Sequence, residues 1–92
     1  MNILITGCAG FIGFHLSEKL LKNKNYKIVG VDNLNSYYSV KLKKDRLKEL
    51  KKKYKKNFIF LRLDITNKQR LKNLLKKFKI ETVINLAAQA GV

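Results

Sequence analysis

Hydrophobic and polar positions follow one another in blocks along the chain, and the period of the pattern changes from block to block. Four short runs are almost continuously apolar, which is typical of strands that are buried on both faces of a parallel sheet. We expect strands at residues 2–6, 26–31, 58–63 and 82–86. Between these runs, apolar residues recur every three or four positions, which is the spacing of a helix with one apolar face.

Three helices are expected from that spacing, the first two at residues 11–23 and 40–56. The first would bury Ile12, Leu16, Leu20 and Leu21, and the second Val40, Leu47, Leu50 and Tyr54. The third carries Leu71, Leu74, Leu75 and Phe78 on one face. Thr66 and Gln69 have the spacing of a capping box and are expected to begin this third helix.

The predicted order of elements is βαβαβαβ. Strands that alternate with helices, joined by right-handed crossovers, favour an α/β fold with a doubly wound parallel sheet of the Rossmann type. The expected strand order is 3-2-1-4. The fourth strand would leave an open edge, so we interpret residues 1–92 as the N-terminal part of a larger domain, truncated after the fourth strand.

The charge and the cysteine content bear on nucleic-acid binding, membrane contact and disulfide bonds. Lysine and arginine total 21 against 6 acidic residues, a formal net charge of +15. This charge would suit a nucleic-acid or anionic surface, but only Arg46, Arg62 and Arg70 are arginines, and the lysines alternate with leucines as on any solvated helix face. We therefore expect no specific nucleic-acid partner and no membrane contact. A single cysteine, Cys8, excludes an internal disulfide and fits a cytoplasmic protein.

The strongest chemical motif is a glycine turn between the first strand and the first helix. Gly7, Gly10 and Gly13 are spaced three apart. Gly7 would permit the tight turn, Gly10 the approach of a pyrophosphate to the backbone, and Gly13 close packing of the helix on the sheet. Asp32 ends the second strand, where a carboxylate accepts hydrogen bonds from ribose hydroxyls and repels a 2′-phosphate. The combination predicts an NAD site rather than an NADP site.

The remaining predicted contacts follow the carboxyl ends of the strands. Asp64 and Ile65 are expected beside the adenine ring, although Asp64 would also suit a cap of the third helix. Small residues after the fourth strand are expected near the pyrophosphate. The predicted cofactor-binding residues are Gly7, Gly10, Phe11, Ile12, Gly13, Asp32, Asn33, Asp64, Ile65, Leu86, Ala87 and Ala88.

With these motifs in place, the chain resembles the extended short-chain dehydrogenase/reductase family, and within it the UDP-glucuronate 4-epimerases. The matching segments are ITGCAGFIGFHL, VDNLNSYY, LDITN and NLAAQAGV. The resemblance implies epimerisation at C4 of a UDP-sugar by transient hydride transfer to bound NAD, in a homodimeric parent protein. It also implies a catalytic Tyr-x-x-x-Lys pair and a substrate domain beyond this segment, so residues 1–92 would be inactive alone. Sugar-nucleotide 4,6-dehydratases share the same N-terminal segment, and both activities stay open.

Other candidate residues do not fit a catalytic role. Tyr37 and Lys41 match Tyr-x-x-x-Lys formally, but they follow the second strand, near the adenosine end of the expected cofactor. Cys8 has no partner for metal binding or nucleophilic attack, and we predict neither a metal site nor a catalytic residue. His15 is expected to pack or face solvent, and Gln89 to lie near cofactor and substrate. The alternative from another class is a non-catalytic basic module that binds nucleic acid or an anionic surface.

Overall fold

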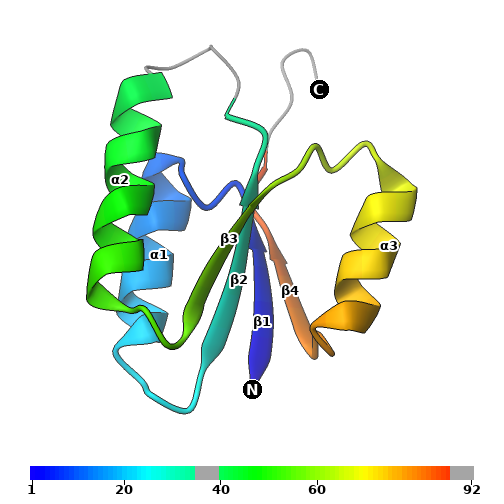
Figure 1. The fold of residues 1–92 in the computed structure, drawn as a ribbon, viewed down its shortest axis with the longest axis horizontal. Coiled ribbons are helices and arrows are strands. Elements are labelled where there is room, and N and C mark those ends of the chain that lie inside the picture. The colour runs from blue at the N-terminus through cyan, green and yellow to red at the C-terminus, as the bar shows by residue number, and fades with distance from the viewer. Residues whose placement is uncertain (35–39, 88–92) are drawn as a thin grey trace.

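Four parallel strands form the centre of the fold, in the order β3-β2-β1-β4 (Figure 1). The structure, a computed structural model, describes residues 1–34 and 40–87. The strands are β1 (Asn2–Thr6), β2 (Lys27–Asp32), β3 (Phe58–Arg62) and β4 (Thr82–Asn85). The predicted fold class and strand order are therefore confirmed.

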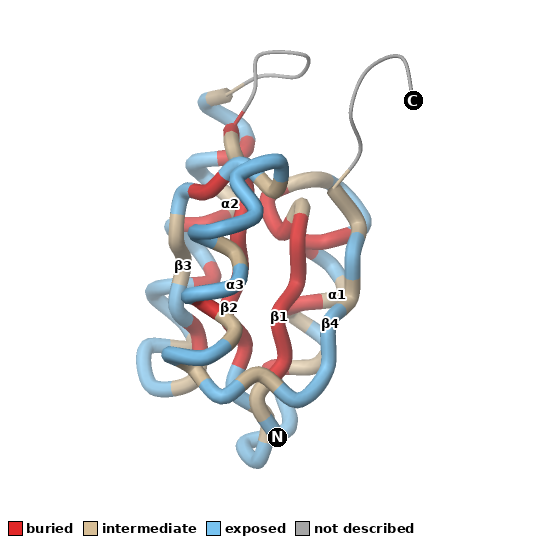
Figure 2. Tube along the Cα trace, turned by 90° about the vertical axis from the view of Figure 1, so that its right-hand side faces the viewer, coloured by how far each residue is buried: buried red, intermediate tan, exposed pale blue. Residues whose placement is uncertain are grey.

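Three helices cover the two faces of the sheet. Figure 1 shows α1 (Phe11–Leu21) and α2 (Val40–Lys53) on one face and α3 (Lys68–Lys77) on the other. Each face has its own apolar cluster, one centred on Ile3, Ile5 and Leu50 and the other on Leu4, Val29 and Val31. The side chains of β1 alternate between the two clusters, as the pleat of a strand buried on both faces requires. Figure 2 accordingly shows β1 and β2 buried, and β4 largely exposed.

The predicted apolar face of the first helix is confirmed at Leu20 and Leu21 and wrong at Ile12. Ile12 is 66% exposed, whereas α1 buries Gly13, Phe14, Ser17 and Leu21. Gly13 lies against the backbone of the glycine turn, so a Cβ placed on it would come within 2.2 Å of the carbonyl oxygen of Gly7. This contact sets the rotation of the helix and turns Ile12 outward. The helix also ends at Leu21, two residues before the predicted end.

The predicted capping box is also wrong. α3 begins at Lys68, and its N-cap is Asn67, whose side chain accepts a hydrogen bond from the backbone N–H of Arg70 at 3.1 Å. Thr66 bonds backward to Asp64, and Gln69 donates to Asn73. Asparagine is as good an N-cap as threonine, and Asn67 stands one residue nearer the apolar run.

The predicted apolar faces of the other two helices are confirmed. Leu47 and Leu50 of α2 are buried, and Leu74 of α3 is buried among Leu4, Val29 and other core residues. Helix α2 ends at Lys53, three residues before the predicted end. Within the described ranges, none of the helices combines the length and the apolarity of a membrane span.

Candidate NAD site at the carboxyl edge of the sheet

The glycine turn lies where the carboxyl ends of all four strands meet, at the top of Figure 1. Gly7 has φ +70°, a conformation that side chains other than glycine rarely adopt. Its N–H donates to the carbonyl oxygen of Val31 at 2.8 Å, and the N–H of Cys8 shares this acceptor at 3.3 Å. The turn is thereby tied to the end of β2, one residue before Asp32.

There is a second reason for glycine at position 7, because the backbone of the segment after β4 passes too close for a side chain. A Cβ on Gly7 would lie 2.8 Å from the backbone nitrogen of Ala87, in the segment after β4. The turn therefore contacts the ends of both β2 and β4. The predicted reason for Gly13 needs a correction, because its nearest backbone neighbours are Gly7 and Cys8 of the turn rather than the body of the sheet.

The N-terminus of α1 points its first backbone N–H groups at this edge. Gly10 is the N-cap and offers no side-chain hydrogen bond, and the first turn holds no acidic residue. Within the described part of the chain, the N–H groups of Phe11, Ile12 and Gly13 have no acceptor, because the first helical bond is donated by Phe14 to Gly10 at 2.9 Å. Such N–H groups, with the positive end of the helix dipole, form a site for an anion.

Asp32 holds the turn as well as marking the expected ribose position. One carboxylate oxygen accepts from the backbone N–H of Ala9 at 3.1 Å, and the other from the N–H of Leu34 at 2.8 Å. Leu34 has φ +56°, so the bond to Asp32 supports an uncommon backbone conformation. Each oxygen keeps a second lone pair. The ribose contact of Asp32 stays a prediction, and the structure adds a role in shaping the loop.

Two cations of α2 contact the carboxylate or the turn that it holds, and neither was predicted. The Lys43 ammonium is 3.8 Å from Asp32 Oδ1, and both side chains are less than one-tenth exposed. Arg46 donates to the carbonyl oxygen of Ala9 at 3.0 Å, and its guanidinium carbon lies 5.9 Å from the ring centre of Phe11. One signal could have indicated Lys43, because it lies between Val40 and Leu47 on the predicted apolar face.

Asp64 joins the ends of β2 and β3. Its carboxylate accepts from the backbone N–H of Thr66 at 2.9 Å and from the Thr66 hydroxyl at 2.7 Å. These two bonds, and a third from the side chain of Asn33, lower the pKa of the Asp64 carboxyl. The adenine contacts predicted for Asp64 and Ile65 remain untested. Ile65 is half-buried against the cluster beneath α3.

The lowered pKa of Asp64 gives a pH-dependent contribution to stability. Because the folded-state pKa lies below the unfolded-state pKa, the contribution is complete above the ordinary aspartate value of about 3.9 and disappears as the pH falls through the folded-state pKa. We expect Asp64→Asn to lower the melting temperature at pH 7 and to have a smaller effect near pH 2, below the ordinary aspartate value. Asp45→Asn is a matched control on an exposed aspartate. An equal effect of Asp64→Asn at both pH values would contradict this assignment.

Thr6, the last residue of β1, was missed by the sequence analysis. It is 2% exposed, and its hydroxyl donates to the side-chain oxygen of Asn85. The same hydroxyl accepts from the N–H groups of Leu86 at 3.0 Å and Ala87 at 3.1 Å. The predicted contact residues Leu86 and Ala87 are thus fixed beside the glycine turn. Ala88 lies outside the described residues.

Replacing the Thr6 hydroxyl should weaken the attachment of Leu86 and Ala87 to the end of β1. Thr6→Val keeps the shape of the side chain and removes the acceptor of the Ala87 N–H, whereas the Leu86 N–H keeps the backbone oxygen of Thr6 at 3.1 Å; the loss should cost about 1–3 kcal/mol of unfolding free energy. Thr82→Val is the control, because Thr82 is an exposed threonine of β4. Urea denaturation of both variants measures the difference, and equal stability of the two would show that the hydroxyl contributes nothing.

Cys8 and His15 are two described residues that the sequence analysis excluded from catalysis, and neither has a partner for proton transfer or nucleophilic attack among the contacts given below. Cys8 is fully buried, and its sulfur occupies the space that a Cβ on Gly30 would need. Burial, followed by the charge of Asp32, raises the pKa of the Cys8 thiol well above its ordinary range. His15 is exposed and makes edge contacts with Phe11 and Phe14. Tyr37 and Gln89 lie outside the described residues.

Lys41, the other half of the rejected Tyr-x-x-x-Lys match, is described. Its ammonium forms an exposed ion pair with Asp45 at 3.1 Å. Among the described residues, no cluster of histidine, cysteine and carboxylate side chains is placed to hold a metal ion.

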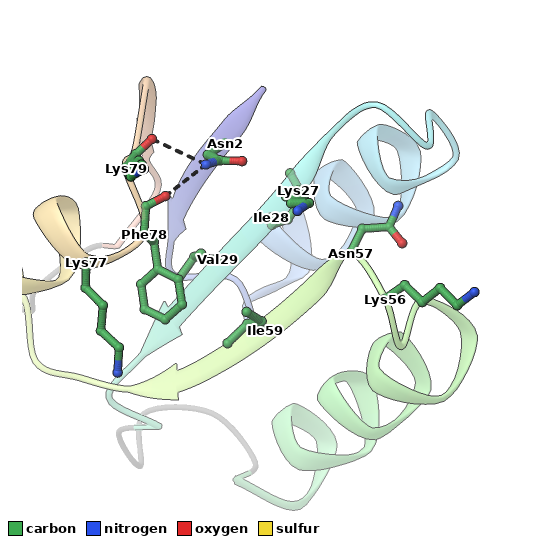
Figure 3. A pocket seen from close by; sticks show the side chains of 10 residues that line it. All are labelled: Asn2, Lys27, Ile28, Val29, Lys56, Asn57, Ile59, Lys77, Phe78 and Lys79. Carbon is green, nitrogen blue, oxygen red and sulfur yellow. Dashed lines mark hydrogen bonds between the residues drawn. The ribbon is translucent and has the colours of Figure 1, made fainter.

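A hollow of about 250 Å³ lies at the opposite end of the strands (Figure 3). Its apolar residues include Val29, Ile59 and Phe78, and no carboxylate, histidine or cysteine lines it. Four lysines from three parts of the chain surround it, namely Lys27, Lys56, Lys77 and Lys79. Because it lies at the amino ends of β2 and β3, this hollow is separate from the glycine turn.

Comparison with known proteins identifies the family of this chain. The family described as GDP-mannose 4,6 dehydratase matches residues 4–92. The chain belongs to this family. A UDP-glucuronate 4-epimerase of Thermodesulfobacterium geofontis is 53% identical over 89 residues, which are 97% of this chain and 27% of the relative.

Two solved structures show the same fold. The UDP-glucuronic acid 4-epimerase of Bacillus cereus, in complex with UDP-glucuronic acid and NAD, superposes with a TM-score of 0.85 at 42% identity, over 100% of this chain and 28% of that chain. A dTDP-glucose 4,6-dehydratase of Bacillus anthracis, in complex with NAD, gives a TM-score of 0.80 at 30% identity, over 98% and 27% of the two chains. The chain thus spans about a quarter of the length of these members, which were crystallised with NAD.

Proposed function

We propose that this chain binds the adenosine and pyrophosphate parts of NAD and supplies that half of the cofactor site to a UDP-sugar 4-epimerase. The observation that carries the proposal is the meeting of three features at one edge of the sheet. These are the glycine turn after β1, the unpaired N–H groups of α1 and the Asp32 carboxylate at the end of β2.

The residues present fit such a cofactor. Gly10 is the least enclosed glycine of the turn, because the one atom near a Cβ placed on it would be the Gly7 oxygen, a tight contact at 3.3 Å. A pyrophosphate can therefore approach the free N–H groups of Phe11, Ile12 and Gly13. Asp32 keeps lone pairs for the ribose hydroxyls, and Asn33, Asp64 and Ile65 would border the adenine.

Bound NAD would supply a reversible hydride acceptor for C4 of the sugar. The chain's own part is to hold the cofactor, with Leu86, Ala87 and Ala88 on the side that leads toward the nicotinamide. Residues 1–92 would form the N-terminal part of the cofactor domain, in a cytoplasmic homodimer. The Tyr-x-x-x-Lys pair and the substrate domain would come from a further segment, so these residues alone would turn over no substrate. UDP-glucuronate is the proposed substrate, supported by the 53% identity to an epimerase named for it.

A chimera tests the proposal. Residues 1–92 replace the matching segment of the Bacillus cereus UDP-glucuronic acid 4-epimerase, which provides the rest of the fold. We expect the purified chimera to retain NAD and to convert UDP-glucuronic acid into its C4 epimer, and the Gly10→Val chimera to lose both properties. A 4-keto, 6-deoxy product would indicate a 4,6-dehydratase instead. Full activity of the Gly10→Val chimera would contradict the assignment of the turn.

The second candidate, a basic module that binds nucleic acid, is favoured by the four lysines around the hollow. Its test compares the binding of labelled single-stranded RNA to two quadruple variants. One changes Lys27, Lys56, Lys77 and Lys79 to Gln, and the control changes the exposed Lys41, Lys44, Lys48 and Lys72 to Gln. Loss of affinity and of salt dependence in the first variant alone would support this candidate. Equal effects would indicate diffuse charge.

A further inference from the structure

Lys43 differs from every other lysine in the described ranges because it is buried. It is 6% exposed, whereas the other lysines of those ranges are all exposed. Lysine is almost never buried unless its charge is paired, since removing an ammonium from water is costly. A buried lysine on the apolar face of α2 therefore calls for a charge partner, and the structure provides Asp32.

The pair lies at the position where the cofactor's adenosine ribose is expected. The Lys43 ammonium is 3.8 Å from Asp32 Oδ1, and the side chains of the two residues are 8% and 5% exposed. Arg46, one helical turn after Lys43, bonds the carbonyl oxygen of Ala9 at 3.0 Å. One cation of α2 thus lies beside the carboxylate that would receive the ribose hydroxyls, and a second contacts the turn that this carboxylate holds.

We propose that Lys43 is a determinant of cofactor selectivity, a buried cation whose attraction for a 2′-phosphate is offset by the Asp32 carboxylate in the pair. In the pair, the positive charge of Lys43 is offset by Asp32, and the carboxylate repels a phosphate on the ribose 2′-oxygen. When the carboxylate is removed, the same ammonium is a binding group for the 2′-phosphate of NADP. This inference rests on the proposed NAD site.

Burial strengthens the attraction between the Lys43 ammonium and a 2′-phosphate. Interactions between charges are weakly screened away from water, so a 2′-phosphate that replaces the Asp32 carboxylate regains an ion pair in a nearly dry environment. An exposed lysine at the same distance would contribute much less. Lys44, the next residue along α2, is exposed and provides a control with the same charge.

The test measures binding of NADPH and NADH to the purified chain by the change in nicotinamide fluorescence, and binding of 2′,5′-ADP and 5′-ADP by calorimetry. Asp32→Ser is expected to tighten NADPH and 2′,5′-ADP about 10- to 100-fold and to weaken NADH. Adding Lys43→Gln to Asp32→Ser should abolish that gain, and adding Lys44→Gln should leave it in place. The inference is overturned if NADPH binding does not improve in Asp32→Ser, or if it improves equally without Lys43.

A second measurement leaves Asp32 untouched, so it holds even if the Asp32 variants do not fold. Lys43→Gln alone should raise the ratio of NADPH to NADH dissociation constants several-fold, because it removes the cation and leaves the repelling carboxylate. A purely structural role for Lys43 would weaken both cofactors equally and leave the ratio unchanged, which would contradict the inference. Failure of the wild-type chain to bind NADH at all would count against the proposed NAD site itself.

Discussion

Gly13→Ala is expected to unfold the beginning of the chain. A Cβ at this position would lie 2.2 Å from the carbonyl oxygen of Gly7 and 2.9 Å from Cα of Cys8, both backbone atoms that cannot rotate away. Relief of this overlap requires α1 to move off the turn and the sheet. We expect a loss of more than about 3 kcal/mol of unfolding free energy, and a melting temperature lower by more than about 10 °C for a domain of this size.

Gly10→Ala is the matched control for this prediction. Gly10 has φ −71°, which alanine adopts without strain, and its added Cβ would meet a single neighbour at 3.3 Å. Circular dichroism during heating compares the two variants with the wild type. A Gly13→Ala variant as stable as Gly10→Ala would show that the contact between helix and turn is not as close as the structure has it.

Asp32→Ala is expected to weaken both the fold and NAD binding. The substitution removes the acceptor of the Ala9 and Leu34 N–H groups and leaves the buried Lys43 without that carboxylate. Breaking a buried ion pair from one side costs about 3–5 kcal/mol. Loss of an ionised acceptor for the ribose hydroxyls, worth about 1.5–3 kcal/mol, should weaken NAD about 10- to 100-fold.

Asp45→Ala provides the control for this change. Asp45 pairs with Lys41 on the surface, and its side chain is 58% exposed, so its loss should alter stability by less than about 1 kcal/mol. Urea denaturation gives the stability of both variants, and calorimetric titration gives their affinity for NAD. An Asp32→Ala variant with wild-type stability and affinity would contradict the position of Asp32 at the centre of the site.

The strands could be predicted from the sequence because their burial on both faces leaves a simple pattern. β1 and β2 lie between two layers of helix, so the residues between the two ends of each strand carry no polar side chain. The position of the glycine turn followed from the same pattern, because Gly7 follows an apolar run and Gly10 directly precedes a helix. Local information was sufficient for these features.

The rotation of α1 and the start of α3 could not be predicted in the same way. Ile12 continues the spacing of Leu16 and Leu20, but the helix is rotated by the contact of Gly13 with Gly7. This contact depends on the three-dimensional shape of the turn. At α3, Thr66 and Asn67 both suited an N-cap, and the bonds of Thr66 to Asp64 decided between them.

The residues missed in the site are those whose partners lie far away in the sequence. Arg46 bonds to Ala9, 37 residues earlier, and the Thr6 hydroxyl bonds to the N–H of Ala87, 81 residues later. Lys43 is one lysine among many, and its place on the predicted apolar face between Val40 and Leu47 was the one signal in the sequence that set it apart. The pairing of Asp32 with Lys43 depends on how α2 packs on the sheet, which no local pattern encodes.

The central claim, that the glycine turn binds a dinucleotide, is tested most directly by calorimetric titration of NAD into the purified chain and its Gly10→Ala variant. We expect one binding site in the wild type and near-wild-type melting behaviour in the variant, because alanine adopts φ −71° without strain and the added Cβ would press on a single atom, the Gly7 oxygen at 3.3 Å. NAD affinity should nevertheless fall at least tenfold in the variant, because the methyl group occupies the approach of the pyrophosphate. Unchanged affinity for NAD in a folded Gly10→Ala variant, or no binding to the folded wild-type chain, would contradict the account.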